Sequence, residues 1–250
     1  MNTAMKTAII IPARYASTRL PGKPLQIIGD KPMILHVANQ ARHAKGIDEV
    51  WIATDHPDIY KVADDAGYKV LLTREDHETG TDRIAEANNS IQADLIVNVQ
   101  GDEPFINPRI IEKAIEPFKD EPDLHMSTLA TQFKSDEEIR NPNAVKVVTD
   151  INSHALYFSR SVIPNPRDKK ENFYLNFPFL RHIGLYVYKK KVLEHLAQMK
   201  PVGLEQMEKL EQLRALYYGY SISVVEVNEI AMSVDTPEDL EKARAFYAAK

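Results

Sequence analysis

Short apolar runs alternate with stretches of helical periodicity through the first half of the chain. The apolar runs, bounded by turn residues, predict strands at residues 7–11, 50–54, 69–73 and 95–99. The helical pattern predicts helices at residues 32–45, 57–66, 81–91 and 108–118. Strands separated by helix-length segments form βαβ units, so this half predicts an α/β fold with a parallel sheet.

The second half contains more strand-like runs and fewer helical stretches. Strands are predicted in "AVKVVTD", "ALYFSRSVIP", "HIGLYVYKK" and "SISVVEV". A helix predicted over residues 204–219 would place four side chains on one apolar face: Met207, Leu210, Leu213 and Tyr217. The opposite face of this helix would carry Glu208, Glu211 and Gln212.

We expect one domain spanning residues 1–250, with residues 151 to about 200 forming a smaller subdomain inserted into its α/β unit. The polar loop "RDKKENFYLNFPF" in this segment carries four aromatic residues: Phe173, Tyr174, Phe177 and Phe179. Aromatic side chains fill cores and are also enriched in subunit interfaces, so both alternatives stand.

Composition narrows the class of protein. The 250 residues are 44% hydrophobic, which is enough for a substantial core. The chain has no apolar run of membrane-spanning length, and its first residues resemble a strand rather than a signal peptide, so a soluble cytoplasmic protein is expected. The absence of cysteine excludes disulfides, a thiol nucleophile and Cys-ligated zinc. A net charge of −5 argues against general nucleic-acid binding.

The segment "IIIPARYASTRLPGKPL", residues 9–25, predicts a strand that runs into a basic loop. Three cations, Arg14, Arg19 and Lys23, follow the strand within ten positions, and hydroxyl groups lie between them. Arginine forks, a lysine point charge and exposed backbone N–H groups suit a polyphosphate. A solvated basic loop without a ligand is the alternative.

Two common phosphate-binding motifs are excluded for this loop. In a P-loop, the Gly-Lys pair is followed by Ser or Thr, whereas Pro24 follows Gly22 and Lys23 here. A dinucleotide-binding strand would be followed by G-x-G-x-x-G, which no predicted strand shows.

Two carboxylates predict a metal site. Asp102 follows a fully apolar strand in "LIVNVQGDEPFINP", and Gly101 would permit close approach of the backbone. Asp235 precedes Thr236, a helix N-cap, in "AMSVDTPEDLEKAR". Mg²⁺ favours one or two carboxylates together with phosphate oxygens. Asp102 in an ordinary β-turn and Asp235 as part of helix initiation are the alternatives.

Eight motifs stand in order across nearly the whole chain: "IPARYASTRLPGKPL", "ATDH", "NVQGDEP", "NPNAVKVV", "ALYFSRSVIP", "RHIGLYVY", "LEQMEKLEQLR" and "VDTPEDLE". Together they closely resemble the 3-deoxy-manno-octulosonate cytidylyltransferases, the CMP-Kdo synthetases of lipopolysaccharide assembly. The resemblance implies a Rossmann-like nucleotidyltransferase fold of the GT-A type, with a mixed central sheet flanked by helices and a smaller dimerisation part. It also implies Mg²⁺, a homodimer, and CMP transfer from CTP to 3-deoxy-D-manno-octulosonate (Kdo).

The resemblance assigns roles to residues of this chain. It implies that Lys23, Arg19, Asp102 and Asp235 are catalytic, with Asp102 and Asp235 binding the metal. The nucleotide would be bound by Ala13, Arg14, Ser17, Lys23, Arg74, Gly80, Thr81, Arg83 and Gln100. Thr79 and Asp82 stand where related sequences often have Ser and Glu. Such a transfer depends on positioning and electrostatics, so it needs no covalent nucleophile.

The same resemblance places the sugar site mainly in the second half. The sugar would be bound by Gln100, Arg160, Arg181, His182, Tyr186, Glu208, Glu211 and Gln212. An arginine fork suits the carboxylate of Kdo. His182 could instead be a hydrogen-bonded core residue, and the polar residues at 208, 211 and 212 could be a solvated helix face.

Three other functions are weighed. A cytidylyltransferase for an 8-amino Kdo analogue would differ in a few side chains. A sialic-acid cytidylyltransferase would share the loop but would not be expected to match "LEQLR" and "VDTPEDLE". A uridylyl- or thymidylyltransferase usually carries G-x-G-T-R, whereas "ARYASTR" lacks those glycines. A non-enzymatic α/β binding protein would not need a cationic loop together with two acids that follow strands.

Overall fold

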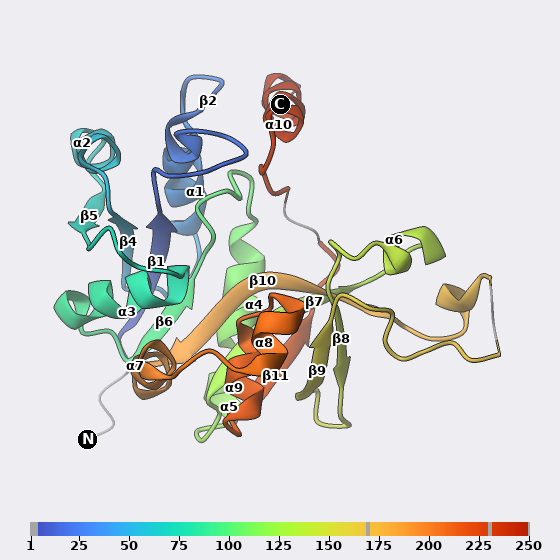
Figure 1. The fold of residues 1–250 in the computed structure, drawn as a ribbon. Coiled ribbons are helices and arrows are strands. Elements are labelled where there is room, and N and C mark those ends of the chain that lie inside the picture. The colour runs from blue at the N-terminus through green and yellow to red at the C-terminus, as the bar shows by residue number, and fades with distance from the viewer. Residues whose placement is uncertain (1–4, 169–170, 230–231, 250) are drawn as a thin grey trace. The chain divides into compact units, whose positions relative to one another are not determined.

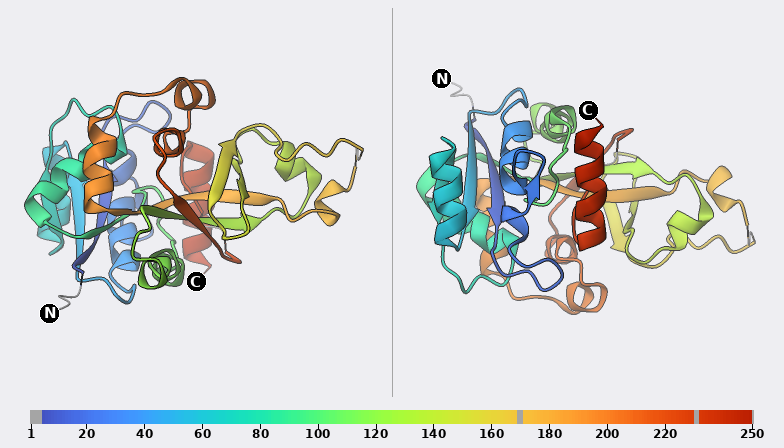
Figure 2. Two further views of the ribbon diagram at one scale, coloured as in Figure 1. Left: turned by 90° about the horizontal axis from the view of Figure 1, so that it is seen from below. Right: turned by 90° about the horizontal axis from the view of Figure 1, so that it is seen from above.

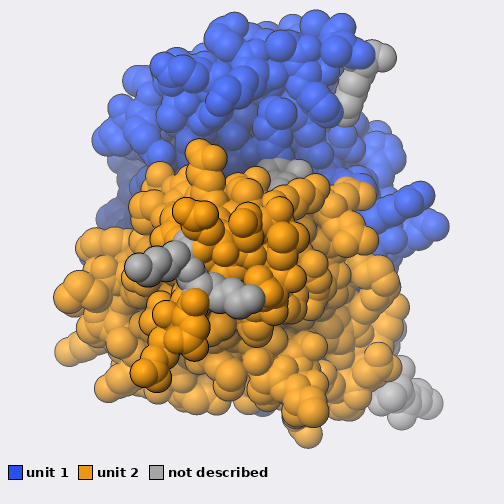
Figure 3. All heavy atoms as spheres, turned by 90° about the vertical axis from the view of Figure 1, so that its right-hand side faces the viewer, with its two compact units in different colours: residues 1–112, 189–197, 231–250 blue, residues 113–188, 198–230 orange. Residues whose placement is uncertain are grey.

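The computed structural model describes residues 5–168, 171–229 and 232–249 (Figure 1). The chain divides into two compact units, shown in different colours in Figure 3: residues 1–112, 189–197 and 231–250 form unit 1, and residues 113–188 and 198–230 form unit 2. The expected single domain with an insertion at about 151–200 stays a prediction.

Four parallel strands form the sheet of unit 1. They are β1 (Thr7–Ala13), β4 (Glu49–Thr54), β5 (Lys69–Leu72) and β6 (Leu95–Asn98), in the order β6-β1-β4-β5. Figures 1 and 2 show helices on both faces of these strands. Strands buried on both faces read as continuous apolar runs, which explains why the sequence predicted all four.

Helices α1 (Met33–Ala41), α2 (Pro57–Asp65) and α3 (Gly80–Ile91) connect these strands. Each begins near its predicted start, and α3 begins with a capping box between Thr79 and Asp82. The helix predicted at 108–118 is divided into α4 (Pro108–Ile115) and α5 (Pro117–Asp120). Pro117 lacks a backbone N–H and therefore starts a new helix instead of continuing the old one.

The end of the chain packs against a small hairpin in unit 1. The short helix η1 (Lys23–Leu25) leads into β2 (Ile27–Ile28) and β3 (Lys31–Pro32), and α10 (Pro237–Ala248) contacts β2. Tyr247 of α10 donates from its hydroxyl to Asp30 at 2.7 Å. Helix α7 (Lys190–Gln198) completes the elements centred in this unit.

Unit 2 contains strands in both directions. They are β7 (Met126–Gln132), β8 (Lys146–Thr149), β9 (Ala155–Ser159), β10 (Leu180–Lys189) and β11 (Ile222–Glu226). Strand β11 is parallel to β7, whereas β10 is antiparallel to both β7 and β8, and β8 is antiparallel to β9. Parallel and antiparallel pairing therefore both occur, as the predicted fold class requires. Unit 2 also contains α6 (Asp136–Arg140) and η2 (Phe173–Leu175).

Strand β7 was not predicted, because its polar residues break the apolar pattern. Ser127 and Thr128 are completely buried in it. Ser127 Oγ donates to the Ala114 carbonyl at 2.5 Å, and Thr128 Oγ1 donates to the Leu185 carbonyl at 2.8 Å. Hydroxyls that are satisfied in this way can be buried at little cost.

The single helix predicted at 204–219 is wrong. The structure has α8 (Gly203–Glu208) and α9 (Gln212–Tyr217), separated by Lys209 in the left-handed region at φ 52°. The predicted apolar face is therefore split: Leu210 and Leu213 are buried, whereas Met207 and Tyr217 are 85% and 62% exposed.

A buried ion pair explains why the apolar pattern misled here. Arg214 Nη2 lies 2.6 Å from Glu205 Oε1, and the two side chains are only 5% and 11% exposed. Charged residues that neutralise each other thus occupy core positions that periodicity assigns to apolar side chains.

The aromatic loop contributes mainly to a core. Phe173 and Phe179 are 2% and 3% exposed and pack with Phe133 and Ile139. Phe177 is 44% exposed, so a subunit contact at that position stays a prediction.

None of the helices in the described residues is long and apolar enough to cross a membrane.

Candidate active site

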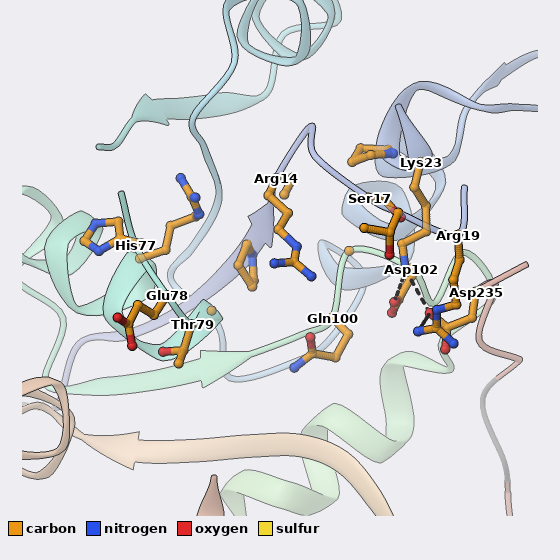
Figure 4. Close-up of a pocket in the computed structure, with 17 residues that line it drawn as sticks. Arg14, Ser17, Arg19, Lys23, His77, Glu78, Thr79, Gln100, Asp102 and Asp235 are labelled. Carbon is orange, nitrogen blue, oxygen red and sulfur yellow. Dashed lines mark hydrogen bonds and ion pairs between the residues drawn. The ribbon is translucent and has the colours of Figure 1, made fainter. Parts of the chain in front are cut away.

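A cavity of about 430 Å³ opens in unit 1 beyond the carboxyl ends of the parallel strands (Figure 4). Such a position is typical of ligand sites in open α/β sheets, and the volume is in the range of small-molecule pockets. It is lined by Pro12, Ala13, Arg14, Ser17, Thr18, Arg19, Lys23, Pro24, His77, Glu78, Thr79, Gly80, Arg83, Gln100, Gly101, Asp102 and Asp235. The cationic loop and the two predicted acids therefore meet in one place.

Lys23 contacts both acids. Its Nζ lies 2.6 Å from Asp102 Oδ2 and 3.0 Å from Asp235 Oδ1. Arg19 Nη2 lies 3.1 Å from the same Asp235 oxygen. Lys23 and Asp102 side chains are 18% and 23% exposed, so their attraction is screened less than that of a surface pair.

Backbone contacts bring the two acids together. The Val234 N–H donates to the Asp102 carbonyl at 2.9 Å, which places Asp235 beside the turn that follows β6 and contains Asp102. Thr236 is the N-cap of α10, as predicted, and Asp239 completes a capping box with it, which leaves the Asp235 side chain outside the cap. A Cβ on Gly101 would lie 2.8 Å from the Pro12 carbonyl oxygen, so only glycine fits this crossing without a shift.

The donor set fits Mg²⁺. Asp102 and Asp235 offer hard carboxylate oxygens at the wall of one cavity, and both are partly exposed. Within residues 5–168, 171–229 and 232–249, no three His, Cys, Asp or Glu side chains form a metal site. Two carboxylates are nevertheless enough for Mg²⁺, because phosphate oxygens and water complete its six ligands.

Glu103, the residue after Asp102, is a buried acid. Burial, and secondly the charge of Asp102, raise the pKa of Glu103 to about 8. Its side chain is therefore mainly protonated at pH 7.

Most predicted nucleotide residues reach this cavity. Ala13, Arg14, Ser17, Lys23, Gly80, Arg83 and Gln100 all line it. Two do not: Thr81 is buried within α3, and Arg74 is an exposed residue whose Nε lies 3.5 Å from both Asp76 and Glu86. Their nucleotide roles stay predictions.

The structure adds His77 and Glu78, just before α3, which the sequence did not single out, and it places Thr79 beside them in the cavity wall. His77, Glu78 and Thr79 line the cavity, and the His77 ring hydrogen-bonds Glu86. A local sequence pattern could have identified these residues: they are polar, they follow a parallel strand, and they come directly before a capped helix. Residues in that position lie at the carboxyl edge of the sheet.

The predicted sugar residues, except Gln100, lie in unit 2. Arg160 and Glu208 contact each other closely: the Arg160 N–H donates to Glu208 Oε2 at 2.9 Å, and Arg160 Nε donates to the Glu208 carbonyl at 2.7 Å. Ser159 Oγ donates to Glu208 Oε1 at 2.6 Å. Lys146 Nζ, which is fully buried, donates to the Arg160 carbonyl at 2.5 Å. Both oxygens of Glu208 are thus occupied by groups of the protein.

The other predicted sugar residues form a second group. His182 is partly buried beside Tyr186, with ring centroids 5.4 Å apart, and its Nε2 lies 3.0 Å from Thr128 Oγ1. Burial lowers the pKa of His182 to about 3 and raises the pKa of Tyr186 well above its ordinary value. Glu211, on the link to α9, contributes a further rise at Tyr186.

Arg181 and Gln212 complete the predicted set. Arg181 lies on β10 and is half-buried opposite Lys146 and Thr131. Gln212 is buried, and its Nε2 has no hydrogen-bond partner among the described residues. A buried amide of this kind suits a ligand hydroxyl or an ordered water.

The family model described as Cytidylyltransferase matches residues 8–226. The class of this protein is therefore that of the nucleotidyltransferases that use CTP. A relative from Pelobacter propionicus, named 3-deoxy-manno-octulosonate cytidylyltransferase, is 48% identical over 98% of each chain. The relative of that name from Escherichia coli is 45% identical over 97% of this chain and 96% of its own. The chain belongs to the 3-deoxy-manno-octulosonate cytidylyltransferase family, and the resemblance predicted from its motifs is confirmed.

Solved structures agree with this assignment. A structure described as CMP:2-keto-3-deoxy-manno-octonic acid synthetase complexed with CTP is 44% identical, with a TM-score of 0.91 over 98% of this chain and 99% of the other. A putative glucose-1-phosphate thymidylyltransferase from Bacillus anthracis is 19% identical, with a TM-score of 0.67 over 96% of this chain and 95% of its own, and this likeness shows the fold alone. The predicted nucleotidyltransferase fold is confirmed.

Proposed function

We propose that this chain transfers CMP from CTP to Kdo, forming CMP-Kdo and pyrophosphate. The observation that supports this most is the cavity in which Lys23 contacts both Asp102 and Asp235, in a chain that matches Kdo cytidylyltransferases over nearly its full length. The related structure complexed with CTP supports CTP as the nucleotide.

In the proposed reaction, the anomeric hydroxyl oxygen of Kdo forms a bond to the α-phosphorus of CTP. The bond from that phosphorus to the bridging oxygen breaks, pyrophosphate leaves with the electron pair, and the hydroxyl proton passes to solvent. Negative charge shifts onto the leaving pyrophosphate and the α-phosphate oxygens. Lys23 and Arg19, with side chains 18% and 65% exposed, would stabilise this charge electrostatically.

Asp102 and Asp235 would hold Mg²⁺, which supplies charge to the phosphates and lowers the pKa of the attacking hydroxyl. Arg14 makes no ion pair with any described residue, so its guanidinium is available to the nucleotide. Gln100 on the same wall would face the nucleotide or the sugar.

The sugar site is proposed in unit 2. Arg181 would pair with the Kdo carboxylate, and His182, Tyr186, Glu211 and Gln212 would contact its hydroxyls. The uncharged state of His182, caused by its burial, fits hydrogen bonding rather than charge pairing.

The proposal also includes a homodimer, a cytoplasmic location and a role in lipopolysaccharide biosynthesis, since all three follow from the family resemblance.

A crossed substrate panel tests the proposed function. Purified protein with Mg²⁺ is given CTP or UTP together with Kdo, its 8-amino analogue or sialic acid, and released pyrophosphate is measured. We expect rapid release with CTP and Kdo and slow release with every UTP combination. If pyrophosphate is released rapidly with the 8-amino analogue or sialic acid but not with Kdo, the acceptor is that other sugar and not Kdo. If no sugar gives release, the proposed function is wrong.

A further inference from the structure

Asp55 joins two parts of the cavity wall although it does not line the cavity itself. It follows β4, and its Oδ1 accepts a hydrogen bond from the Tyr15 backbone N–H at 3.1 Å. Its Oδ2 lies 2.8 Å from Arg83 Nη2. One carboxylate therefore connects the start of the cationic loop to helix α3.

The register of the sheet explains why these groups meet. Ala13 at the end of β1 pairs with Thr54, and Thr54 pairs with Leu72 in β5, so the residues after these strands share one edge. Arg83 reaches across this edge: its Nη1 donates to Thr73 Oγ1 at 2.5 Å and to the Arg74 carbonyl at 3.3 Å.

The pair formed by Asp55 and Arg83 is largely removed from water. The two side chains are 13% and 4% exposed. Low exposure reduces screening, and a charge left alone at such a place would be costly. Asp55 is therefore a firm support for the loop rather than an incidental surface contact.

A second contact holds the same point of the loop. The Tyr15 ring stacks on the His56 ring with centroids 3.9 Å apart and an interplanar angle of 15°. His56 is itself fixed, because its Nδ1 accepts from the Asp58 N–H at 3.2 Å as the N-cap of α2. Gly22 lies near this ring, since a Cβ added to Gly22 would lie 3.7 Å from the Tyr15 ring.

These contacts bear on the catalytic lysine. Gly22 directly precedes Lys23, and it adopts φ +60° where it meets Tyr15. The Tyr15 ring thus lies near the residue that turns the chain toward Lys23. We propose that Asp55 and Tyr15 are positioning residues that hold the cationic loop in the conformation that binds the triphosphate of CTP. This inference rests on the proposed function for the identity of the nucleotide.

Substitution of Asp55 by Asn tests the carboxylate. An amide presents one acceptor and one donor, whereas both partners of Asp55 are donors, so Asp55→Asn must lose one of the two contacts. We expect the Kd and the KM for CTP to rise about tenfold or more, with the KM for Kdo unchanged. The matched control is Asp64→Asn on α2, which is exposed and should leave both values as in the wild type.

Substitution of Tyr15 tests the stack without a risk to folding, because this side chain is 40% exposed. Tyr15→Ala removes the ring but keeps the backbone N–H that donates to Asp55. We expect the Kd for CTP to rise about three- to tenfold, and Tyr15→Phe should restore it, because Phe keeps the stacked ring.

CTP binding is measured by titration calorimetry without sugar, KM values by pyrophosphate release, and the melting temperature of each variant by calorimetry. If the wild type binds CTP but does not turn over Kdo, the proposed function is wrong. The role of Asp55 and Tyr15 in CTP binding is then still decided by the CTP Kd values. Unchanged CTP binding in both Asp55→Asn and Tyr15→Ala would overturn it. So would an equal rise in the KM of both substrates. If Asp55→Asn does not fold, the comparison of Tyr15→Ala with Tyr15→Phe decides alone.

Discussion

Lys23 Nζ lies 2.6 Å from Asp102 Oδ2, although the two residues are 79 positions apart in the chain. The same nitrogen is 3.0 Å from Asp235 Oδ1. The protein's own cation therefore pairs with both carboxylates that are proposed to bind Mg²⁺. A metal ion held by these acids would compete with Lys23 for the same oxygens. The triphosphate of CTP, by drawing Lys23 toward itself, would then release the acids to the metal.

This competition predicts that removing Lys23 strengthens metal binding by the nucleotide-free protein. In Lys23→Met the two carboxylates repel each other without a cation between them, and a divalent metal relieves that repulsion. We expect Mn²⁺, used as a spectroscopic probe for Mg²⁺, to bind the variant about tenfold or more tightly than the wild type in electron paramagnetic resonance titrations.

Turnover of Lys23→Met should fall at the same time, since the charge on the α-phosphate loses its partner. Lys31→Met is the control, because Lys31 pairs with Asp30, at 3.7 Å, and with no other acid in the part of the chain that the structure describes. Equal Mn²⁺ affinity in the wild type and Lys23→Met would show that the lysine does not compete with the metal.

Replacing either Asp102 or Asp235 by an amide should largely abolish activity without unfolding the protein. Asp102→Asn and Asp235→Asn keep the side-chain shape but remove the negative charge that is proposed to hold the metal. We expect pyrophosphate release to fall by about a hundredfold or more in each, with circular dichroism spectra as in the wild type. Asp123→Asn, an exposed site in unit 2, is the control. Near-normal turnover in either variant would remove that residue from the metal site.

Gly29 should be far less tolerant of alanine than another glycine of similar backbone conformation. Gly29 and Gly67 have φ of +61° and +76°, but a Cβ on Gly29 would lie 2.0 Å from the Tyr247 ring, whereas nothing lies within 4 Å of one on Gly67. We expect Gly67→Ala to cost about 1 kcal/mol of unfolding free energy and Gly29→Ala about 2 kcal/mol more. Chemical denaturation measures both. Similar losses would mean that the Tyr247 contact yields easily.

His182 should make the protein less stable as the pH falls below about 6.5. Its folded pKa of about 3 is below its ordinary value because burial disfavours the charged form. Between these two values the unfolded chain binds a proton that the folded chain does not, so stability falls as the pH falls through this window. At higher pH the contribution is fully present.

The measurement compares the unfolding free energy of the wild type with that of His182→Gln at several pH values. The advantage of the wild type should shrink by up to about 1.4 kcal/mol for each pH unit below 6.5. His43→Gln, at an exposed site in unit 1, should show no such trend. A constant difference between the wild type and His182→Gln would indicate that His182 titrates normally in the folded protein.

Local patterns predicted much of the fold. The four parallel strands, the starts of α2 and α3 and the capping box of α10 follow from apolar runs and from Ser, Thr, Asp and Pro at helix starts, which act within a few residues. Prediction from local patterns failed where buried polar or charged side chains are satisfied by partners that lie elsewhere in the sequence. Strand β7 has buried hydroxyls, and the break between α8 and α9 accompanies the buried pair of Glu205 and Arg214.

The sequence by itself determined the class of protein, the order of its elements and the kinds of group in its site: a cationic loop after the first strand and two acids that follow buried segments. Only the tertiary structure decided that Lys23 contacts both acids and that Asp55 connects the loop to Arg83. The reason is physical, because parallel strands bring their carboxyl ends to one edge, and which side chains meet there depends on register, burial and competing partners that no local pattern records.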